Sequence, residues 1–541
     1  MEPLQKLPYE SKELVAMLPL ALPALCGILC LVADLFIPRG RGRSSTALGM
    51  ISFAGALLTA LACLAAWSGT DDRVVIAGSL AVSRFASFLS LSVLLATGLI
   101  SLAAMHHGLP AFGLAVADGQ GRSGSSVAHG EFFALVQFAT SGMLALIAAN
   151  DLLTLFVALE ILSISVYCLT GLDRQRSRSA EGAMKYFVLG AVASGFLLYG
   201  ISLLYGATHT LRLDQIAAMQ LHPGQQSLAL VGSVMLMVGL LFKVGAVPFH
   251  AWTPDAYEGA PTASTGFMSV AVKAAAFGAS LRVLAALGSA GALGAVGAWL
   301  LWLIAGLTVI VGNAGALTQR NPRRLLAYSA IAHSGYVLIG LVALARTWDP
   351  GHPGTAGGEA AERLALAGKD AVQGVIFYLL AYAAANVGAF AVLCHLERGG
   401  EEIEDLADLA GLAKTQPGVA LAMTLAMISL AGIPCTAGFV GKLWVFRAAV
   451  STGDVGLVLL GLVTSVLSLF YYLRVVVVMY MQEPGQGLPG DLGAARVPAP
   501  DPSRWGSRLS LAAASVITVL LGIYPGQRLM DMVAEGAEAL L

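Results

Sequence analysis

Residues 240–262 read LLFKVGAVPFHAWTPDAYEGAPT, an apolar helical run that carries Lys243 and is interrupted at Pro248. A proline cannot donate to the carbonyl four residues before it and pushes against that carbonyl. The carbonyl of Val244 should therefore be free to bind water or the Lys243 ammonium. A charge at mid-bilayer depth costs about 2.5–3.5 kcal/mol by insertion scales, so a lysine kept in such a run indicates a function.

The composition predicts that the whole chain lies in a membrane. Hydrophobic residues make up 57% of the 541 residues and charged residues 12%, which is about half the charged fraction of an average soluble domain. Stretches of about 20 apolar residues, long enough to cross a hydrocarbon core, recur throughout. We expect an all-α polytopic membrane protein with about fourteen transmembrane helices. The expected spans are 14–37, 46–67, 80–105, 130–149, 152–171, 182–205, 227–248, 261–286, 294–317, 323–346, 371–396, 418–449, 454–481 and 507–530.

A weak internal repeat divides the chain. The seventh span is interrupted at Pro248, and the twelfth span is interrupted at Pro434 in SLAGIPCTAGFVGKLWVF. Interrupted segments at matching places in two halves indicate an ion site, and an odd shift of five spans would invert the second unit. We expect three N-terminal helices over 1–129, a first five-helix repeat over 130–286, a second, inverted repeat over 287–481, and a loop with the last helix over 482–541.

Buried ionisable side chains are the candidates for function. Glu160 lies near mid-membrane, where an unpaired carboxylate would protonate and a lysine partner would keep it charged. Burial brings the pKa of a lysine toward neutrality and a nearby carboxylate raises it again, so movement of Glu160 relative to Lys243 would switch a proton on or off. The predicted proton carriers are Glu160, Lys243, Lys273 and Lys442, with Lys185 and His333 as further candidates.

The sequence allows two interpretations for each of three features. Lys185 lies one turn inside its span, so its ammonium could instead reach back to the cytoplasmic surface. His333 could relay protons or be a hydrogen-bonded structural residue. The acidic stretch GGEEIEDLADLAGL at 399–412 has the spacing of a short surface helix, and it is either a solvated connector or a docking site for a neighbouring subunit.

The sequence contains no motif for binding nucleic acid, a metal, haem or a nucleotide phosphate. A net charge of −1 and the lack of a basic patch argue against nucleic acid. The six cysteines lack the clustered spacing of zinc or iron–sulfur sites, and no pair of intramembrane histidines suits haem. Because we expect no strands, we also expect no phosphate-binding glycine loop between a strand and a helix. We expect no metal, cofactor or redox centre in the chain itself.

Arginines predict the orientation. The connections after spans one, five and nine read PRGRGRSS, DRQRSRS and QRNPRRL, whereas those after spans two, four, eight and twelve carry few basic residues. Arginine excess marks the cytoplasmic side. An even number of spans then places both termini in the periplasm.

Three segments together resemble the antiporter-like membrane subunits of respiratory complex I. They are residues 240–262, the stretch NDLLTLFVALEILSISVYCLTG at 150–171, and GIPCTAGFVGKLWVF at 432–446. The resemblance implies that Glu160 pairs with Lys243 and is followed by Lys273 and Lys442. M-type members carry Glu at the position of Lys442 and L-type members add a lateral helix, which by elimination leaves the N type. Cys435 stands where the family usually has a second proline, so we expect the break to survive with less rigidity.

The resemblance also implies a place in a larger assembly. The chain would translocate protons in the inner membrane of a bacterium, beside M-type and small membrane-arm subunits. NADH, flavin, iron–sulfur clusters and quinone would be handled by partner subunits. Two alternatives remain: a subunit of a multi-subunit Na⁺(K⁺)/H⁺ antiporter or membrane-bound hydrogenase, and a scaffold that has lost pumping, against which the retained lysines argue.

Overall fold

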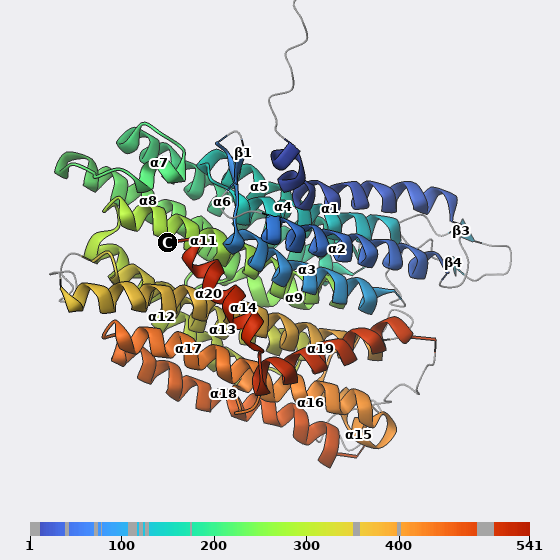
Figure 1. The fold of residues 1–541 in the computed structure, drawn as a ribbon. Coiled ribbons are helices and arrows are strands. Elements are labelled where there is room, and N and C mark those ends of the chain that lie inside the picture. Colours follow the sequence, from blue (N-terminus) through green and yellow to red (C-terminus); the bar gives the residue numbers. More distant parts are fainter. Residues whose placement is uncertain are drawn as a thin grey trace, which may run out of the picture.

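The computed structural model is a bundle of long helices that lie side by side (Figure 1). It describes residues 11–37, 43–69, 74–76, 78–105, 116–117, 123–124, 129–173, 176–349, 358–397, 402–483 and 503–541. Within these residues, 13 helices are long and apolar enough to cross a membrane. The predicted all-α membrane fold is confirmed.

The first half of the chain, blue to green, occupies one side of the bundle, and the second half, yellow to red, occupies the other (Figure 1). The first-half helices are α1 (Ser11–Phe36), α2 (Arg43–Gly69), α3 (Arg84–Ala104), α4 (His129–Ala148), α5 (Leu152–Thr170), α6 (Ser177–Thr208), α7 (Leu213–Ala217), α8 (Pro223–Val244), α9 (Trp252–Gly259), α10 (Thr262–Phe267), the π-helical turn η1 (Met268–Val272) and α11 (Lys273–Ser289). The second-half helices are α12 (Gly294–Leu317), α13 (Pro322–Arg346), α14 (Glu359–Leu396), the 3₁₀ turn η3 (Leu406–Leu409), α15 (Leu412–Thr415), α16 (Pro417–Ala431), α17 (Ala437–Ser451), α18 (Val455–Met481), α19 (Trp505–Ile523) and α20 (Gln527–Glu538).

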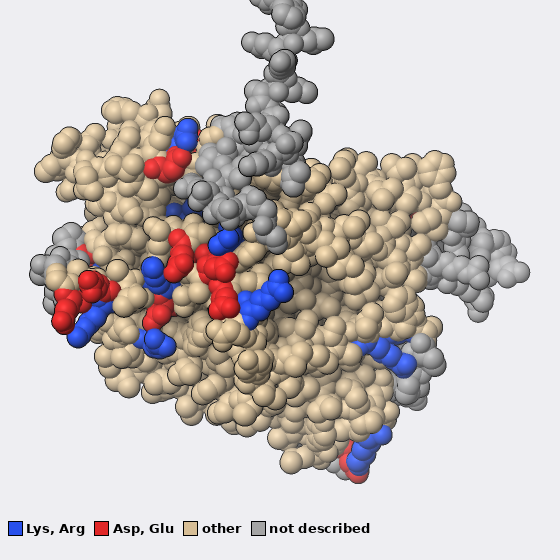
Figure 2. Space-filling view, in the orientation of Figure 1, with Lys and Arg blue, Asp and Glu red and all other residues tan. Residues whose placement is uncertain are grey.

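The packing matches a lipid environment. Large apolar side chains of the peripheral helices α1, α2, α6 and α18 point outward, such as Phe36, Phe187 and Phe470. Figure 2 accordingly shows wide areas without charged residues. The helices α10, α11, α13 and α14 are almost wholly buried in the centre of the bundle. Polar groups on these central helices are therefore shielded from lipid.

Glycines end the two interrupted helices. Gly245 follows α8 with φ +70°, and Gly432 follows α16 with φ +82°. In each case the glycine and the next residue donate their N–H groups to carbonyls of the last helical turn, a C-cap that needs a left-handed residue. The predicted interruptions are present, but the helices end before Pro248 and Pro434, at residues that can adopt a positive φ.

The second interrupted span resumes as a separate helix after its glycine. Residues 418–449, expected as one span, form the two fifteen-residue helices α16 and α17. Cys435, between them, has φ +67°. A proline, whose φ is fixed near −65°, could not adopt this backbone conformation.

Two further expectations are wrong in detail. The span expected at 507–530 stops at Ile523, and Gly526 turns the chain into the separate helix α20. This helix carries charged residues that pair with neighbours, as Glu535 does with Arg84 at 3.3 Å, and these charges gather on the face shown in Figure 2. No strand was expected, yet two short hairpins form in connections: β1 (Val74–Ile76) with β2 (Leu80–Val82), and β3 (Val116–Ala117) with β4 (Ser123–Gly124).

Candidate functional site

Lys243 lies in the last turn of α8 and is 2% exposed. Its Nζ donates to the Tyr167 hydroxyl at 3.1 Å and faces the rings of Tyr167 and Tyr186 at 4.9 and 5.2 Å. Such cation–π contacts stabilise an ammonium by about 0.5–2 kcal/mol. The sequence predicted a carboxylate partner, but a phenol and two aromatic faces hold this ammonium.

Glu160 lies on α5 and accepts a hydrogen bond from the Ser194 hydroxyl of α6 at 2.5 Å. The Glu160 carboxylate interacts electrostatically with Lys243, but among the described residues neither side chain forms an ion pair with the other. The structure therefore places Glu160 and Lys243 in one region, without a direct contact between their charged groups. A proton passing between them would need a bridging water or a side-chain movement.

Lys273 follows the π-helical turn η1 directly. Its Nζ donates to the Ala330 carbonyl at 2.5 Å and to the Ser334 hydroxyl at 2.7 Å, both on α13. The Ser334 hydroxyl donates in turn to the Val244 carbonyl at 2.6 Å. Among the described residues this carbonyl accepts from Ser334, and Lys243 donates to Tyr167 instead. Ser334 thus connects the end of α8 with Lys273. The π-helical turn before Lys273 also fits a functional role, because such turns occur frequently at functional sites.

Lys442 lies on α17 and turns back toward the interruption before it. Its Nζ donates to the carbonyls of Leu430 and Ala431 at 3.1 and 3.0 Å and to the Ser465 hydroxyl at 2.9 Å. Both carbonyls lie in the last turn of α16, where a helix leaves its carbonyls without a donor of its own.

His333 lies on α13 and is buried. One ring nitrogen, Nδ1, lies 2.7 Å from the Tyr378 hydroxyl, and Nε2 lies 3.1 Å from the Tyr472 hydroxyl. His333 interacts electrostatically with both Lys273 and Lys442. The residue is hydrogen-bonded, as the structural interpretation requires, and its role as a proton relay stays a prediction.

Lys185 lies outside this buried row. Its side chain is 44% exposed and pairs with Glu181 at 2.6 Å and Asp255 at 2.7 Å. Asp255 also binds Arg324 at 3.0 Å. The geometry favours the interfacial interpretation of Lys185.

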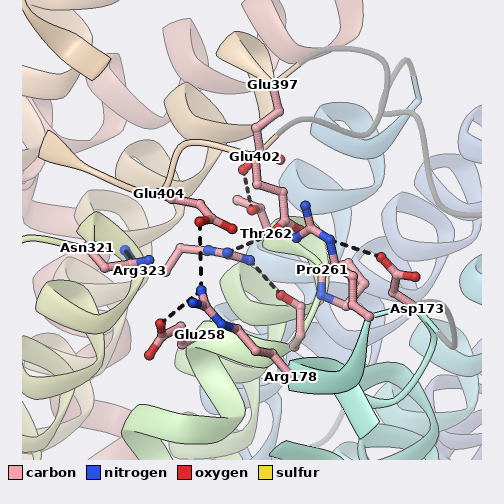
Figure 3. Close-up of polar contacts among 12 residues, drawn as sticks. Asp173, Arg178, Glu258, Pro261, Thr262, Asn321, Arg323, Glu397, Glu402 and Glu404 are labelled. Atoms are coloured by element: carbon pink, nitrogen blue, oxygen red, sulfur yellow. Dashed lines mark hydrogen bonds and ion pairs between the residues drawn. The ribbon is translucent and has the colours of Figure 1, made fainter. Parts of the chain in front are cut away.

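The acidic stretch is tied to both halves of the chain (Figure 3). Glu402 binds Arg176, in the connection before α6, and Arg323 at the start of α13, the latter at 2.6 Å. Glu404 lies 3.7 Å from Arg178. The surface helix expected here is instead the two short turns η3 and α15, with their leucines buried. Glu402 therefore ties the two halves of the chain together.

Sequence reasoning missed the side chains that hold the predicted residues: Ser194, Tyr167, Ser334, Tyr378, Tyr472 and Ser465. Hydroxyl residues are common in membrane helices and carry no spacing signal of their own. Only the position of Ser334 next to His333 hinted at its role. In the part of the chain that the structure describes, no group of three His, Cys, Asp or Glu side chains could hold a metal ion.

Residues 149–349 and 362–468 match the family described as "NADH:quinone oxidoreductase/Mrp antiporter, TM". The chain belongs to this family. Subunit N of the NADH-quinone oxidoreductase of Trichlorobacter lovleyi is 39% identical over 88% of this chain and 89% of that protein. The resemblance predicted from residues 150–171, 240–262 and 432–446 is confirmed.

Solved structures of the family have the same fold. A chain of respiratory complex I from Thermus thermophilus with bound aureothin is 32% identical, with a TM-score of 0.72 over 95% of this chain and 99% of that chain. A chain of the Mrp complex from a Dietzia species covers 97% of this chain and 97% of its own length with a TM-score of 0.72. At 22% identity the Mrp likeness shows the shared fold alone.

Proposed function

We propose that this chain is the N-type, proton-translocating membrane-arm subunit of a bacterial NADH:quinone oxidoreductase. The observation that carries the proposal is the row of Lys243, Lys273 and Lys442, each at most 5% exposed and each held by neutral oxygen atoms. A buried ammonium without a carboxylate contact is costly, so each amine can release its proton at little extra cost. The membership of the family and its subunit N relatives supply the biological setting.

The proton would pass from the Glu160–Lys243 region to Lys273 and then, through His333, to Lys442. Ser334 supports the first step because it contacts both Lys273 and the end of α8. Bridging waters are needed between these groups, since no pair of them is in direct contact. Oxidation of NADH and reduction of quinone, with flavin and iron–sulfur clusters, belong in this proposal to partner subunits, beside M-type and small membrane-arm chains.

Deletion of the gene in its host bacterium tests the assignment. Membranes without the chain should lose coupled NADH:quinone turnover and NADH-driven proton uptake into inverted vesicles. A subunit of an independent Na⁺(K⁺)/H⁺ antiporter would leave that turnover intact and abolish a cation-dependent pH gradient instead. Copurification of the chain with redox subunits provides the second measurement, and a hydrogenase would copurify with a different redox set.

The proposal includes fourteen membrane crossings, with α16 and α17 sharing one, and two inverted five-helix units over 130–286 and 287–481. The arginine-rich connections would face the cytoplasm and both termini the periplasm. We expect alkaline phosphatase fused after Leu541 to be active and a cytoplasm-only reporter at the same place to be inactive. The reverse pattern would reject this topology.

A further inference from the structure

The helices α10 and α14 are joined by polar contacts at two levels. Near the arginine-rich end, Thr262 donates to Glu397 Oε1 at 2.5 Å (Figure 3). Deeper in the bundle, Asn386 donates to the Ser269 hydroxyl at 2.7 Å. Ser269 lies in the π-helical turn that precedes Lys273. The interface thus runs from the end of the bundle to the turn that places Lys273.

Buried polar atoms without a hydrogen-bond partner gather around this interface. Within the described residues they include the Ser264 hydroxyl on α10, Asn386 Oδ1 and the Tyr382 hydroxyl on α14, and the Tyr257 hydroxyl on α9. The Tyr382 ring lies 5.0 Å from the His333 ring. Because an unsatisfied buried polar group is costly, such atoms normally bind ordered water. Ordered water at these atoms would form a path along the interface, toward the turn before Lys273 at Asn386 and toward His333 at Tyr382.

Helix geometry places Glu397 on this path. Asn386 and Glu397 are eleven residues apart, which corresponds to about three turns and about 16 Å along one face. Phe390 lies between them and packs on Gly266, where an added Cβ would approach the Phe390 Cβ to 2.8 Å. Apolar constrictions of this kind gate water in membrane pores. The path therefore has a polar entrance, an apolar constriction and a polar inner section.

The carboxyl group of Glu397 is suited to take up a proton. The residue is 3% exposed, and burial raises the pKa of its carboxyl to about 7, against the opposing effect of Arg323. The charged groups around it are Arg323 from α13, Arg176 before α6, Glu402 from the acidic stretch, and Arg504 before α19, which donates to the Glu397 carbonyl. On α14 itself, the titratable residues His395 and Cys394 precede Glu397, and the Cys394 thiol interacts electrostatically with it.

We propose that Glu397 is the proton-loading group of a cytoplasmic uptake path along the α10–α14 interface, with Asn386 and Tyr382 ordering the water that leads to Lys273. The inference rests on the proposed function. The carboxylate takes one proton from cytoplasmic water, and that proton passes along ordered water, across the constriction at Phe390, to the neutral amine of Lys273. The carboxylate is thereby regenerated and the ammonium formed.

The test uses the intact complex in inverted vesicles, whose outer medium contacts the cytoplasmic face. Glu397→Gln keeps an acceptor for Thr262 but cannot carry a proton, so NADH-driven proton uptake should fall about a hundredfold or more, the order expected for loss of an acid–base group. Asn386→Leu removes the amide that orders water between Phe390 and Lys273, so it should produce a comparable loss of proton uptake. Glu404→Gln, which removes a half-exposed carboxylate of the acidic stretch, is the matched control and should pump normally.

A pH profile separates proton loading from a purely structural role. In Glu397→Asp, uptake should recover, with its alkaline limb shifted to lower pH, because aspartate has the lower ordinary pKa. Normal pumping in Glu397→Gln beside an impaired Lys273→Ala would overturn the uptake path and leave the proposed function standing. Normal pumping in both variants would overturn the two together. An unshifted alkaline limb in Glu397→Asp would also reject the loading role.

Discussion

Replacing Lys442 with alanine is expected to lower coupled NADH:quinone turnover and proton pumping by about a hundredfold or more, the order expected for a lost proton-transfer group. In the proposed path Lys442 is the last buried carrier before the periplasm. Blocking the exit should also slow the distant electron transfer, because the two processes are coupled. Oxidation of NADH by a soluble artificial acceptor bypasses quinone and should remain unchanged.

Two further variants make this experiment sharper. Lys442→Arg should restore little turnover, because a guanidinium can bind the carbonyls of Leu430 and Ala431 but cannot release its proton. Lys414→Ala removes an exposed lysine that pairs with Glu483 and should behave like the unmodified chain, since a surface pair contributes about 0–1 kcal/mol. Full turnover in an assembled Lys442→Ala complex would reject the exit role.

Loss of either Glu160 or Lys243 is expected to have the second large effect. Glu160→Ala and Lys243→Ala should each reduce turnover and pumping together, by about a hundredfold or more, with the complex still assembled. The charge-reversed pair should not restore activity. The faces of Tyr167 and Tyr186 surround the Lys243 ammonium, and an aromatic face attracts a cation but repels a carboxylate.

Tyr167→Phe separates the contribution of the hydroxyl group near Lys243 from that of the aromatic ring. It removes the hydroxyl that accepts from Lys243 and keeps the ring face, so we expect an intermediate loss of pumping. Glu181→Gln, at a 61% exposed carboxylate, is the control for Glu160 and should leave pumping unchanged. Wild-type pumping in assembled Glu160→Ala would contradict the proposed switch.

Much of the site was readable from the sequence because charge in an apolar run is costly. Lys243, Lys273 and Lys442 stood out for that reason, and all three are buried in the structure. Glu397 did not stand out, since it lies at the end of an expected span, two residues before the acidic stretch at 399–412. Its burial depends on Thr262 and on arginines that lie far away in the sequence.

The sequence by itself determined that this is a helical membrane protein, where its spans lie, and which charged residues are placed inside them. These properties follow from transfer energies that each segment has alone. Only the tertiary structure decided that Tyr167 rather than Glu160 contacts Lys243, that Ser334 takes the Val244 carbonyl, and that the helices end at Gly245 and Gly432. Hydrogen bonds between helices depend on rotation and depth, and residue spacing along one helix does not encode the position of its neighbours.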